Sequence, residues 1–149
     1  MKQKSLIQIW GKAKSGKTET IKIIRNELEK RYINVNHIYS FPLPRGEIFE
    51  IFNCNGYNIG ISSMGDDLSS DLEIHLNDCF SKCSIIIAAS RIYNNVDKYL
   101  DKNCNLNAFR RIRATNYRIE GTKLEKFEFN KSSAMHIVYL IDQIMSGRI

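Results

Sequence analysis

The 149-residue sequence predicts a single α/β domain, residues 1–149, in which helices cover both faces of a mainly parallel sheet and give three layers. Three observations indicate this class. Short apolar runs alternate with segments of helical periodicity along the chain. One run, "SIIIAAS" at residues 84–90, is apolar throughout its centre, as expected of a strand buried on both faces. The length suffices for one core but not for a second sizeable domain.

The first half of the chain is predicted to contain two strands, a helix and a hairpin. Ile21, Ile24 and Leu28 share one face of the helix, and Asn55-Gly56 is a strong hairpin signal between two apolar arms. The two prolines of "FPLPRG" are expected to break regular structure. In chain order the elements are a strand at 5–10, a helix at 17–31, a strand at 34–40 and a hairpin at 47–64.

The second half is predicted to alternate helix and strand. Its last helix carries an apolar stripe and ends at Gly147, a typical helix stop. The stripe consists of Ala134, Ile137, Val138, Ile141, Ile144 and Met145. In chain order the elements are a helix at 69–83, a strand at 84–90, a helix at 92–102, a strand at 110–121 and a helix at 131–147.

The segment "GKAKSGKT", residues 11–18, matches the complete pattern G-x-x-x-x-G-K-[ST]. It stands between the first predicted strand and the first predicted helix, which is the context that this pattern requires. A glycine-rich turn without a ligand is the alternative interpretation. Because strand, loop and helix agree, the sequence predicts a loop that binds the phosphates of a nucleoside triphosphate.

The residue types of this loop suit that chemistry. Gly11 and Gly16 allow unusual backbone dihedrals and a close approach of N–H groups to phosphate oxygens. Lys17 is expected to contact the β- and γ-phosphates, and the Thr18 hydroxyl to hold Mg²⁺. The helix that begins near Lys17 is expected to place its positive N-terminal end beside the same phosphates. The expected nucleotide contacts are Gly11, Lys14, Ser15, Gly16, Lys17 and Thr18, with Lys17 also a catalytic candidate.

An acidic residue near the loop is needed to hold the metal or to orient a nucleophile. The usual run of four apolar residues ending in Asp is missing. Asp66, in "SMGDD" after the second hairpin arm, is the nearest substitute and is predicted as both catalytic and metal-binding. Adjacent Asp67 ranks second. The alternative is a turn in which Asp66 only caps the next helix.

Two arginine features follow the later strands. Arg91, directly after "SIIIAAS", is a catalytic candidate that would neutralise charge on a transferring phosphoryl group, or else a surface charge. An arginine cluster interleaved with Phe109 and Tyr117 is interpreted as a lid, as a nucleic-acid surface, or as a solvated face. The cluster consists of Arg110, Arg111, Arg113 and Arg118.

The four cysteines form no C-x-x-C pair and are expected to be free thiols. His75, Cys79 and Cys83 are spaced along one helical face, which is the only arrangement that suggests a metal ligand set. The same face carries Leu72, Leu76 and Phe80. We therefore interpret it as a core stripe, because no fourth ligand is spaced to complete a tetrahedron.

The net charge of +6 fits an anionic partner without identifying one. The longest apolar run is far too short for a membrane span, and the basic N-terminus leads into the phosphate loop without a cleavage site. These features predict a cytoplasmic protein that does not enter a membrane. They leave its oligomeric state open.

On the strength of "GKAKSGKT" the chain is identified as a member of the P-loop NTPase superfamily, and its size and arginine-rich region resemble the kinase branch. "IGISSMGDD" is similar to the "GIASQGD"-like segment of small bacterial and phage ATP-binding proteins. The resemblance implies a three-layer P-loop NTPase fold with bound ATP and Mg²⁺. It assigns Gly11, Gly16, Lys17 and Thr18 as nucleotide and metal contacts, with Asp66 as the acid.

The sequence thus predicts a small kinase that transfers the γ-phosphoryl group of ATP to a nucleotide, a nucleoside or a polynucleotide end. The acceptor would be held by the loops after Ile51 and Arg91. A nucleotide-dependent ATPase or switch, acting through a partner protein or nucleic acid, is the main alternative because no acceptor motif is readable. A purely nucleic-acid-binding protein is a third interpretation, which depends only on the net charge and on the "FRRIRATNYR" patch at residues 109–118.

Overall fold

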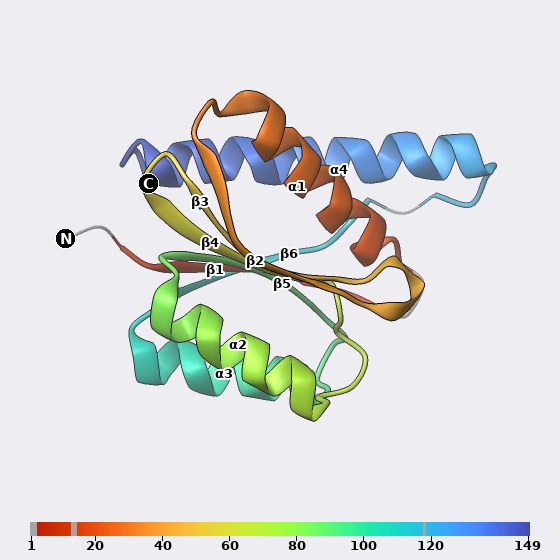
Figure 1. Ribbon diagram of the computed structural model, residues 1–149. Helices are drawn as coiled ribbons and strands as arrows, with labels where there is room; N and C mark the ends of the chain where they lie inside the picture. Colours follow the sequence, from red (N-terminus) through yellow and green to blue (C-terminus); the bar gives the residue numbers. More distant parts are fainter. Residues whose placement is uncertain (1–2, 13–14, 118) are drawn as a thin grey trace.

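The computed structural model describes residues 3–12, 15–117 and 119–149 (Figure 1). Six strands and four α-helices occur in this part of the chain. In order they are β1 (Ser5–Trp10), α1 (Lys17–Arg31), β2 (Val35–Pro42), the 3₁₀ turn η1 (Pro44–Gly46), β3 (Ile48–Cys54), β4 (Tyr57–Ser62), α2 (Ser70–Lys82), β5 (Ile85–Ser90), α3 (Asn95–Asn107), β6 (Arg110–Ala114) and α4 (Lys123–Met145).

The strands form one mixed, mostly parallel sheet of order β2-β3-β4-β5-β1-β6. β4, β5, β1 and β6 run parallel to one another, whereas β3 is antiparallel to both of its neighbours. The central position of β1 and β5 explains their apolar sequences, because both of their faces are covered. The predicted α/β class with a mainly parallel sheet is confirmed.

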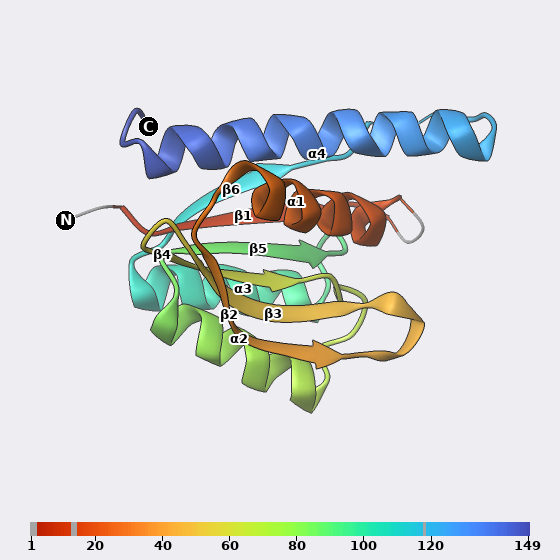
Figure 2. The ribbon, with the colours of Figure 1, turned by 45° about the horizontal axis from the view of Figure 1, so that its top comes forward.

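Helices cover both faces of the sheet (Figures 1 and 2). α1 and α4 lie on one face, where Ile7 and Ile9 of β1 pack against Ile24 and Val138. α2 and α3 lie on the other, where Leu6 belongs to a second core. Alternate residues of a strand point to opposite faces, so a single strand contributes to both cores. The predicted three-layer arrangement is therefore present.

The predicted hairpin is confirmed as β3 and β4. Asn55 and Gly56 have φ angles of 51° and 86°, the left-handed pair that a two-residue hairpin turn favours. The expectation that both prolines of 41–46 break regular structure is wrong for Pro42, which ends β2. β2 is an edge strand, and such a strand tolerates a residue that lacks an N–H group.

Several boundaries in the second half differ from the predicted ones, among them the end of α3, which is Asn107 and not 102. α3 begins at Asn95, not 92, because the Asn94 side chain caps it by accepting from the Asp97 N–H. α4 begins at Lys123, not 131, with Thr122 and Glu125 forming a capping box. β6 ends at Ala114, so 115–121 is a loop except for position 118, which lies outside the described residues. Within the described ranges, no helix is both long and apolar enough to cross a membrane.

Candidate functional site

The predicted site residues lie at the edge of the sheet where the parallel strands end. The loops after β1, β4 and β5 leave the sheet there, and antiparallel β3 begins there. Ligands of open α/β sheets bind at this edge. The loops enclose a cavity of about 770 Å³, lined by Ser15, Gly16, Lys17, Thr18, Glu19, Pro44, Arg45, Glu47, Ser63, Met64, Gly65, Asp66, Asp67 and Ser69.

The loop at residues 11–16, which we call the phosphate-type loop after its sequence pattern, connects β1 to the first turn of α1. Gly16 is the N-cap of α1 and has a φ angle of 80°, a left-handed conformation that favours glycine. A Cβ at this position would also collide with the side chain of Asn130 on α4. Glycine thus lets the loop turn into α1 and leaves the first N–H groups of the helix directed at this edge.

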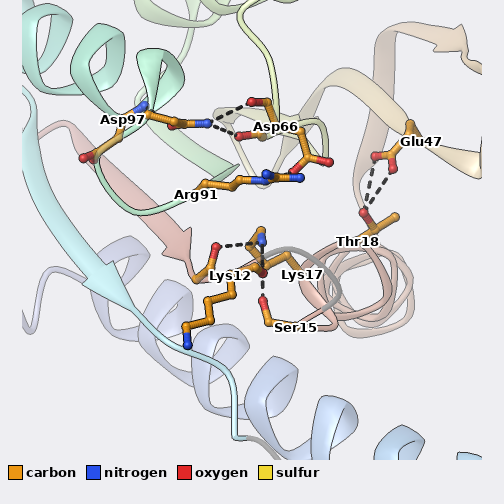
Figure 3. Close-up of polar contacts among 11 residues, drawn as sticks. Lys12, Ser15, Lys17, Thr18, Glu47, Asp66, Arg91 and Asp97 are labelled. Atoms are coloured by element: carbon orange, nitrogen blue, oxygen red, sulfur yellow. Dashed lines mark hydrogen bonds and ion pairs between the residues drawn. The ribbon is translucent and has the colours of Figure 1, made fainter.

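Lys17 is folded into the loop rather than extended into solvent. Its Nζ donates hydrogen bonds to the carbonyl oxygens of Gly11 and Lys12, at 3.0 and 2.7 Å, and only 8% of the residue is exposed. Figure 3 shows the ammonium group beside the Ser15 hydroxyl, with the Asp66–Arg91 pair across the site. Burial lowers the pKa of Lys17, with an opposing contribution from the Asp66 carboxylate.

Thr18 is paired with an acid that the sequence analysis missed. Its hydroxyl donates to the Glu47 carboxylate at 3.2 Å (Figure 3). The same carboxylate accepts from the Ser63 hydroxyl, which in turn accepts from the N–H of Ile48. Glu47 precedes β3, and the register that pairs Phe49 with Ser62 brings it to the end of β4. The predicted hairpin contained this signal, because its arms must bring position 47 beside the residues after Ser62.

Asp66 and Arg91 form an ion pair across two neighbouring loops. The Arg91 Nε lies 2.8 Å from Asp66 Oδ1. The Arg91 side chain is 45% exposed and the Asp66 side chain 60%. The hydrogen bond from Arg91 to Asp66 raises the pKa of the arginine. The alternative role of Asp66 as the cap of α2 is wrong, because Ser69 caps that helix by accepting from the Leu72 N–H.

The loops that carry Asp66 and Arg91 are tied together by their backbones. Arg91 N donates to Gly65 O at 3.2 Å, and the Asn94 amide donates to the carbonyl oxygens of Gly65 and Asp66 at 2.7 and 3.1 Å. A Cβ on Gly65 would lie 2.6 Å from the backbone of Ala89, so glycine is required for this approach. The ion pair therefore rests on a fixed framework at the end of β5.

The structure brings most of the predicted residues together. Lys17, Thr18 and Asp66 line one cavity, whereas Arg91 is not part of its lining and is joined to it only by the ion pair with Asp66. Gly11 is hydrogen-bonded through its N–H to Ser90 O at 3.1 Å, which fixes the start of the loop against β5. Ser15 and Gly16 line the cavity as well. Lys14 lies outside the described residues, so its predicted nucleotide contact stays a prediction.

The described members of the arginine cluster do not act as one surface. Arg110 donates to the Ser5 hydroxyl at 3.1 Å, Arg111 points toward α3, and Arg113 lies over the Trp10 ring at 4.4 Å from its centroid. All three lie in β6, which pairs with β1 inside the sheet; Arg110 faces one side of the sheet, and Arg111 and Arg113 face the other. The interpretation of these three residues as a lid is therefore wrong. Arg118 lies outside the described residues.

Arg111 belongs instead to a buried polar network beneath the site. Its Nε donates to Gln8 Oε1 at 2.8 Å, and its guanidinium pairs with Asp97. The Gln8 amide donates to Ser90 Oγ at 2.6 Å and to Asp97 Oδ1 at 2.7 Å. Asp97 also accepts from the Tyr93 N–H at 3.1 Å. We call Gln8, Ser90, Asp97 and Arg111 the closed network, because its members are paired with one another.

The stripe of His75, Cys79 and Cys83 is part of the core, as predicted. His75 Nε2 lies 2.7 Å from Ile61 O and its Nδ1 lies 2.7 Å from the Tyr39 hydroxyl, so both ring nitrogens have partners. Burial lowers the pKa of His75. All four cysteines are free and buried. Over residues 3–12, 15–117 and 119–149, no group of three or more acidic, His or Cys side chains is arranged to hold a metal by itself.

The arrangement can accept an anion at the loop and a cation between that anion and the acids. Lys17 and the start of α1 supply positive charge, and Thr18, Glu47 and Asp66 supply oxygen ligands on the same cavity. Such a combination suits phosphate groups that carry a divalent cation. The chain matches no protein-family model, no curated protein and no solved structure, so its function has to be argued from this site.

Proposed function

We propose that this chain is a P-loop phosphotransferase of the NTPase superfamily, which binds ATP with Mg²⁺ and transfers the γ-phosphoryl group in a kinase-like reaction. The observation that carries the proposal is the position of Lys17. Its ammonium lies inside the loop between β1 and α1, on the same cavity as Thr18, Glu47 and Asp66. This is the layout that phosphoryl transfer requires, because its catalysis depends on positioning and charge neutralisation.

The loop offers phosphate oxygens several donors at once. The Lys17 ammonium would exchange the carbonyl oxygens of Gly11 and Lys12 for phosphate oxygens, which accept stronger, charge-assisted hydrogen bonds. The first turn of α1, whose N-cap Gly16 provides no side-chain cap, would add backbone N–H donors at the same end of the helix. The low exposure of Lys17 strengthens its attraction to an anion, because screening by water is weak there.

The oxygen ligands around Thr18 fit Mg²⁺, which prefers one or two carboxylates together with substrate phosphates. Thr18 and Glu47 would hold the ion on one side of the cavity, and Asp66 would contribute from the other, directly or through a water molecule. When bound, Mg²⁺ neutralises charge on the β- and γ-phosphates. Glu47 thus takes the place of the acid that usually ends a strand near such a loop.

The Asp66–Arg91 pair would serve the transfer itself. Arg91 would stabilise charge on the moving phosphoryl group, and Asp66 would orient this guanidinium or accept the proton of the acceptor hydroxyl. The cavity volume of about 770 Å³ falls within the range typical of small-molecule sites, which leaves room for an acceptor beside the triphosphate. A nucleotide, a nucleoside or a polynucleotide end is the proposed acceptor class.

An ATPase or switch module is the second candidate, and one observation favours it. Four acids, Glu19, Glu47, Asp66 and Asp67, line the cavity together with the cations Lys17 and Arg45, and two of the acids are paired outside the lining, Asp66 with Arg91 and Glu19 with Lys22. Like charges repel, so these acids disfavour a phosphorylated acceptor and suit water as the nucleophile. Dispersal of three arginines of the cluster removes the main support for a purely nucleic-acid-binding protein.

Product analysis with two acid variants tests the proposal. Asp66→Asn should retain ATP binding and slow γ-phosphoryl transfer by at least about 100-fold, the lower end of a general-base effect. Glu47→Gln should raise the Mg²⁺ concentration needed for activity. Asp71→Asn, an exposed acid at the start of α2 that does not line the cavity, is the matched control and should change activity little. ADP formed in step with an added acceptor supports the kinase, and slow ADP formation without one supports the ATPase.

Full activity in both Asp66→Asn and Glu47→Gln would contradict the proposed roles of the two acids. Thermal unfolding of each variant serves as the folding control. Both side chains are half-exposed or line an open cavity, so the substitutions should leave the fold intact.

A further inference from the structure

A second, smaller cavity adjoins the phosphate-type loop. It has a volume of about 180 Å³ and shares Ser15 and Gly16 with the larger one. Its other walls come from the loop after β6 and from α4, including Tyr117, Glu120 and Phe129. Figures 1 and 2 show why these segments meet: the first turns of α4 project past the sheet on the side where α1 begins.

The aromatic wall of this cavity is held in place at the surface. The Tyr117 N–H donates to Ser133 Oγ at 3.0 Å, and its hydroxyl lies 2.9 Å from His136 Nδ1, so α4 fixes both ends of the residue. The Phe129 ring meets the Tyr117 ring edge to face, with centroids 6.5 Å apart. The two residues are 48% and 39% exposed and belong to neither core, so their ring surfaces are open to a ligand.

Direct contacts fix the distance between this cavity and the phosphate loop. The Asn116 amide donates to Ser15 O and to Thr20 Oγ1, both at 3.0 Å, which ties the loop after β6 to the start of α1. On the other wall, the Asn130 side chain packs against Gly16 where a Cβ would stand. A ligand that lies in both the loop and the cavity would therefore meet a preformed surface.

We propose that this cavity is the base pocket of the protein, and that it binds the adenine ring of ATP against Tyr117 and Phe129. The inference rests on the proposed function, since it needs a triphosphate in the adjoining loop. Aromatic side chains supply stacking surface to any nucleobase. Adenine also carries an amino donor beside ring-nitrogen acceptors, and the pocket offers the Glu120 carboxylate and the Lys126 ammonium as their complements.

Comparison of Mg–ATP with Mg–tripolyphosphate separates base recognition from phosphate recognition. In calorimetric titrations, Phe129→Ala should weaken ATP binding by about 5- to 150-fold, the range expected for loss of one stacking contact. Tripolyphosphate binding should be unchanged in this variant. Phe127→Ala is the matched control, because Phe127 is an exposed phenylalanine on the same helix that does not line the cavity. It should bind both ligands like the wild type.

Three further variants keep the test decisive. Phe129→Trp preserves the stacking surface and should retain ATP affinity. Glu120→Gln should reduce the ratio of ATP affinity to UTP affinity, because the base of UTP lacks the amino group. Lys17→Ala should weaken both ligands, so a failure of the phosphate site is seen separately. Equal ATP affinities for the wild type, Phe129→Ala and Phe127→Ala would overturn the base pocket while leaving the phosphate site standing.

Discussion

Two groups of polar residues meet at the end of β5, and they differ in what remains available to a ligand. The closed network includes Ser90. The second group, which we call the open site, includes the next residue, Arg91, together with Lys17, Thr18, Glu47 and Asp66. In the closed network the side chains of Asp97 and Arg111 are only 7% and 13% exposed. The open site contains the same kind of ion pair, but the side chains of Asp66 and Arg91 are 60% and 45% exposed, and Asp66 lines the cavity. Burial and closure, rather than residue type, therefore distinguish charges that are paired in the interior from charges that a ligand can reach.

The largest expected effect is the loss of the closed network. Asp97→Ala would leave Arg111 buried without its main partner, and we expect it to lower the free energy of unfolding by about 3–5 kcal/mol. Asp101→Ala is the matched control, because Asp101 pairs with the same arginine but its side chain is 59% exposed. That change should cost about 0–1 kcal/mol. Urea unfolding measures both.

Equal losses of unfolding free energy in Asp97→Ala and Asp101→Ala would contradict the distinction between the closed network and the open site. Asp97→Asn, which keeps the size and part of the hydrogen bonding, provides a milder change if Asp97→Ala does not fold. Where a variant is folded, its Mg–ATP affinity should equal that of the wild type, since the network lies beneath the site and lines neither of the cavities next to the loop.

The open site should respond to pH through Lys17. Burial lowers the pKa of its ammonium in the free protein, whereas bound phosphate would raise it, so binding at alkaline pH takes up a proton. The affinity should be constant at lower pH and should fall as pH rises through the lowered pKa toward 10.5, by up to about tenfold per pH unit. Titrations at several pH values measure this slope. A rise in affinity over the same range would contradict the assignment.

The stability of the fold should depend on pH in the opposite direction, and should fall as the pH is lowered. His75 is buried and neutral, and its pKa in the folded state lies below the ordinary value of 6.5. Below pH 6.5 the unfolded chain binds a proton that the folded chain does not, so stability is lost as pH falls, by up to about 1.4 kcal/mol per pH unit. His75→Gln should reduce this slope in urea unfolding measured from pH 7 to 5. An unchanged slope would mean that His75 is protonated in the fold.

Local signals account for the parts of the fold that the sequence predicted. The loop at 11–18 and the Asn55-Gly56 turn depend on adjacent residues, so spacing alone locates them. The early start of α4 was missed because residues 123–129 are all exposed and carry no apolar periodicity. The capping box at Thr122 and Glu125 was the available signal.

The parts of the site that were missed depend on the tertiary fold. Glu47 reaches Thr18 only through the register of β3 against β4, and Arg111 is buried only because the strand order brings β1 and α3 beside it. A run of arginines in a sequence suggests surface charge, because the alternation that turns Arg110 away from Arg111 and Arg113 is known only once the strand is placed.

One titration tests the central claim that the loop holds the phosphates of ATP. Trp10 directly precedes Gly11, so its fluorescence should report on the loop. Its ring meets the Tyr93 ring edge to face, with the ring centroids 6.1 Å apart. Mg–ATP should change the wild-type emission in a saturable way, and calorimetry should show binding about 10- to 150-fold weaker in Lys17→Ala. Lys82→Ala, an exposed lysine on α2, should bind like the wild type. Equal ATP affinities in Lys17→Ala, Lys82→Ala and the wild type would contradict the account.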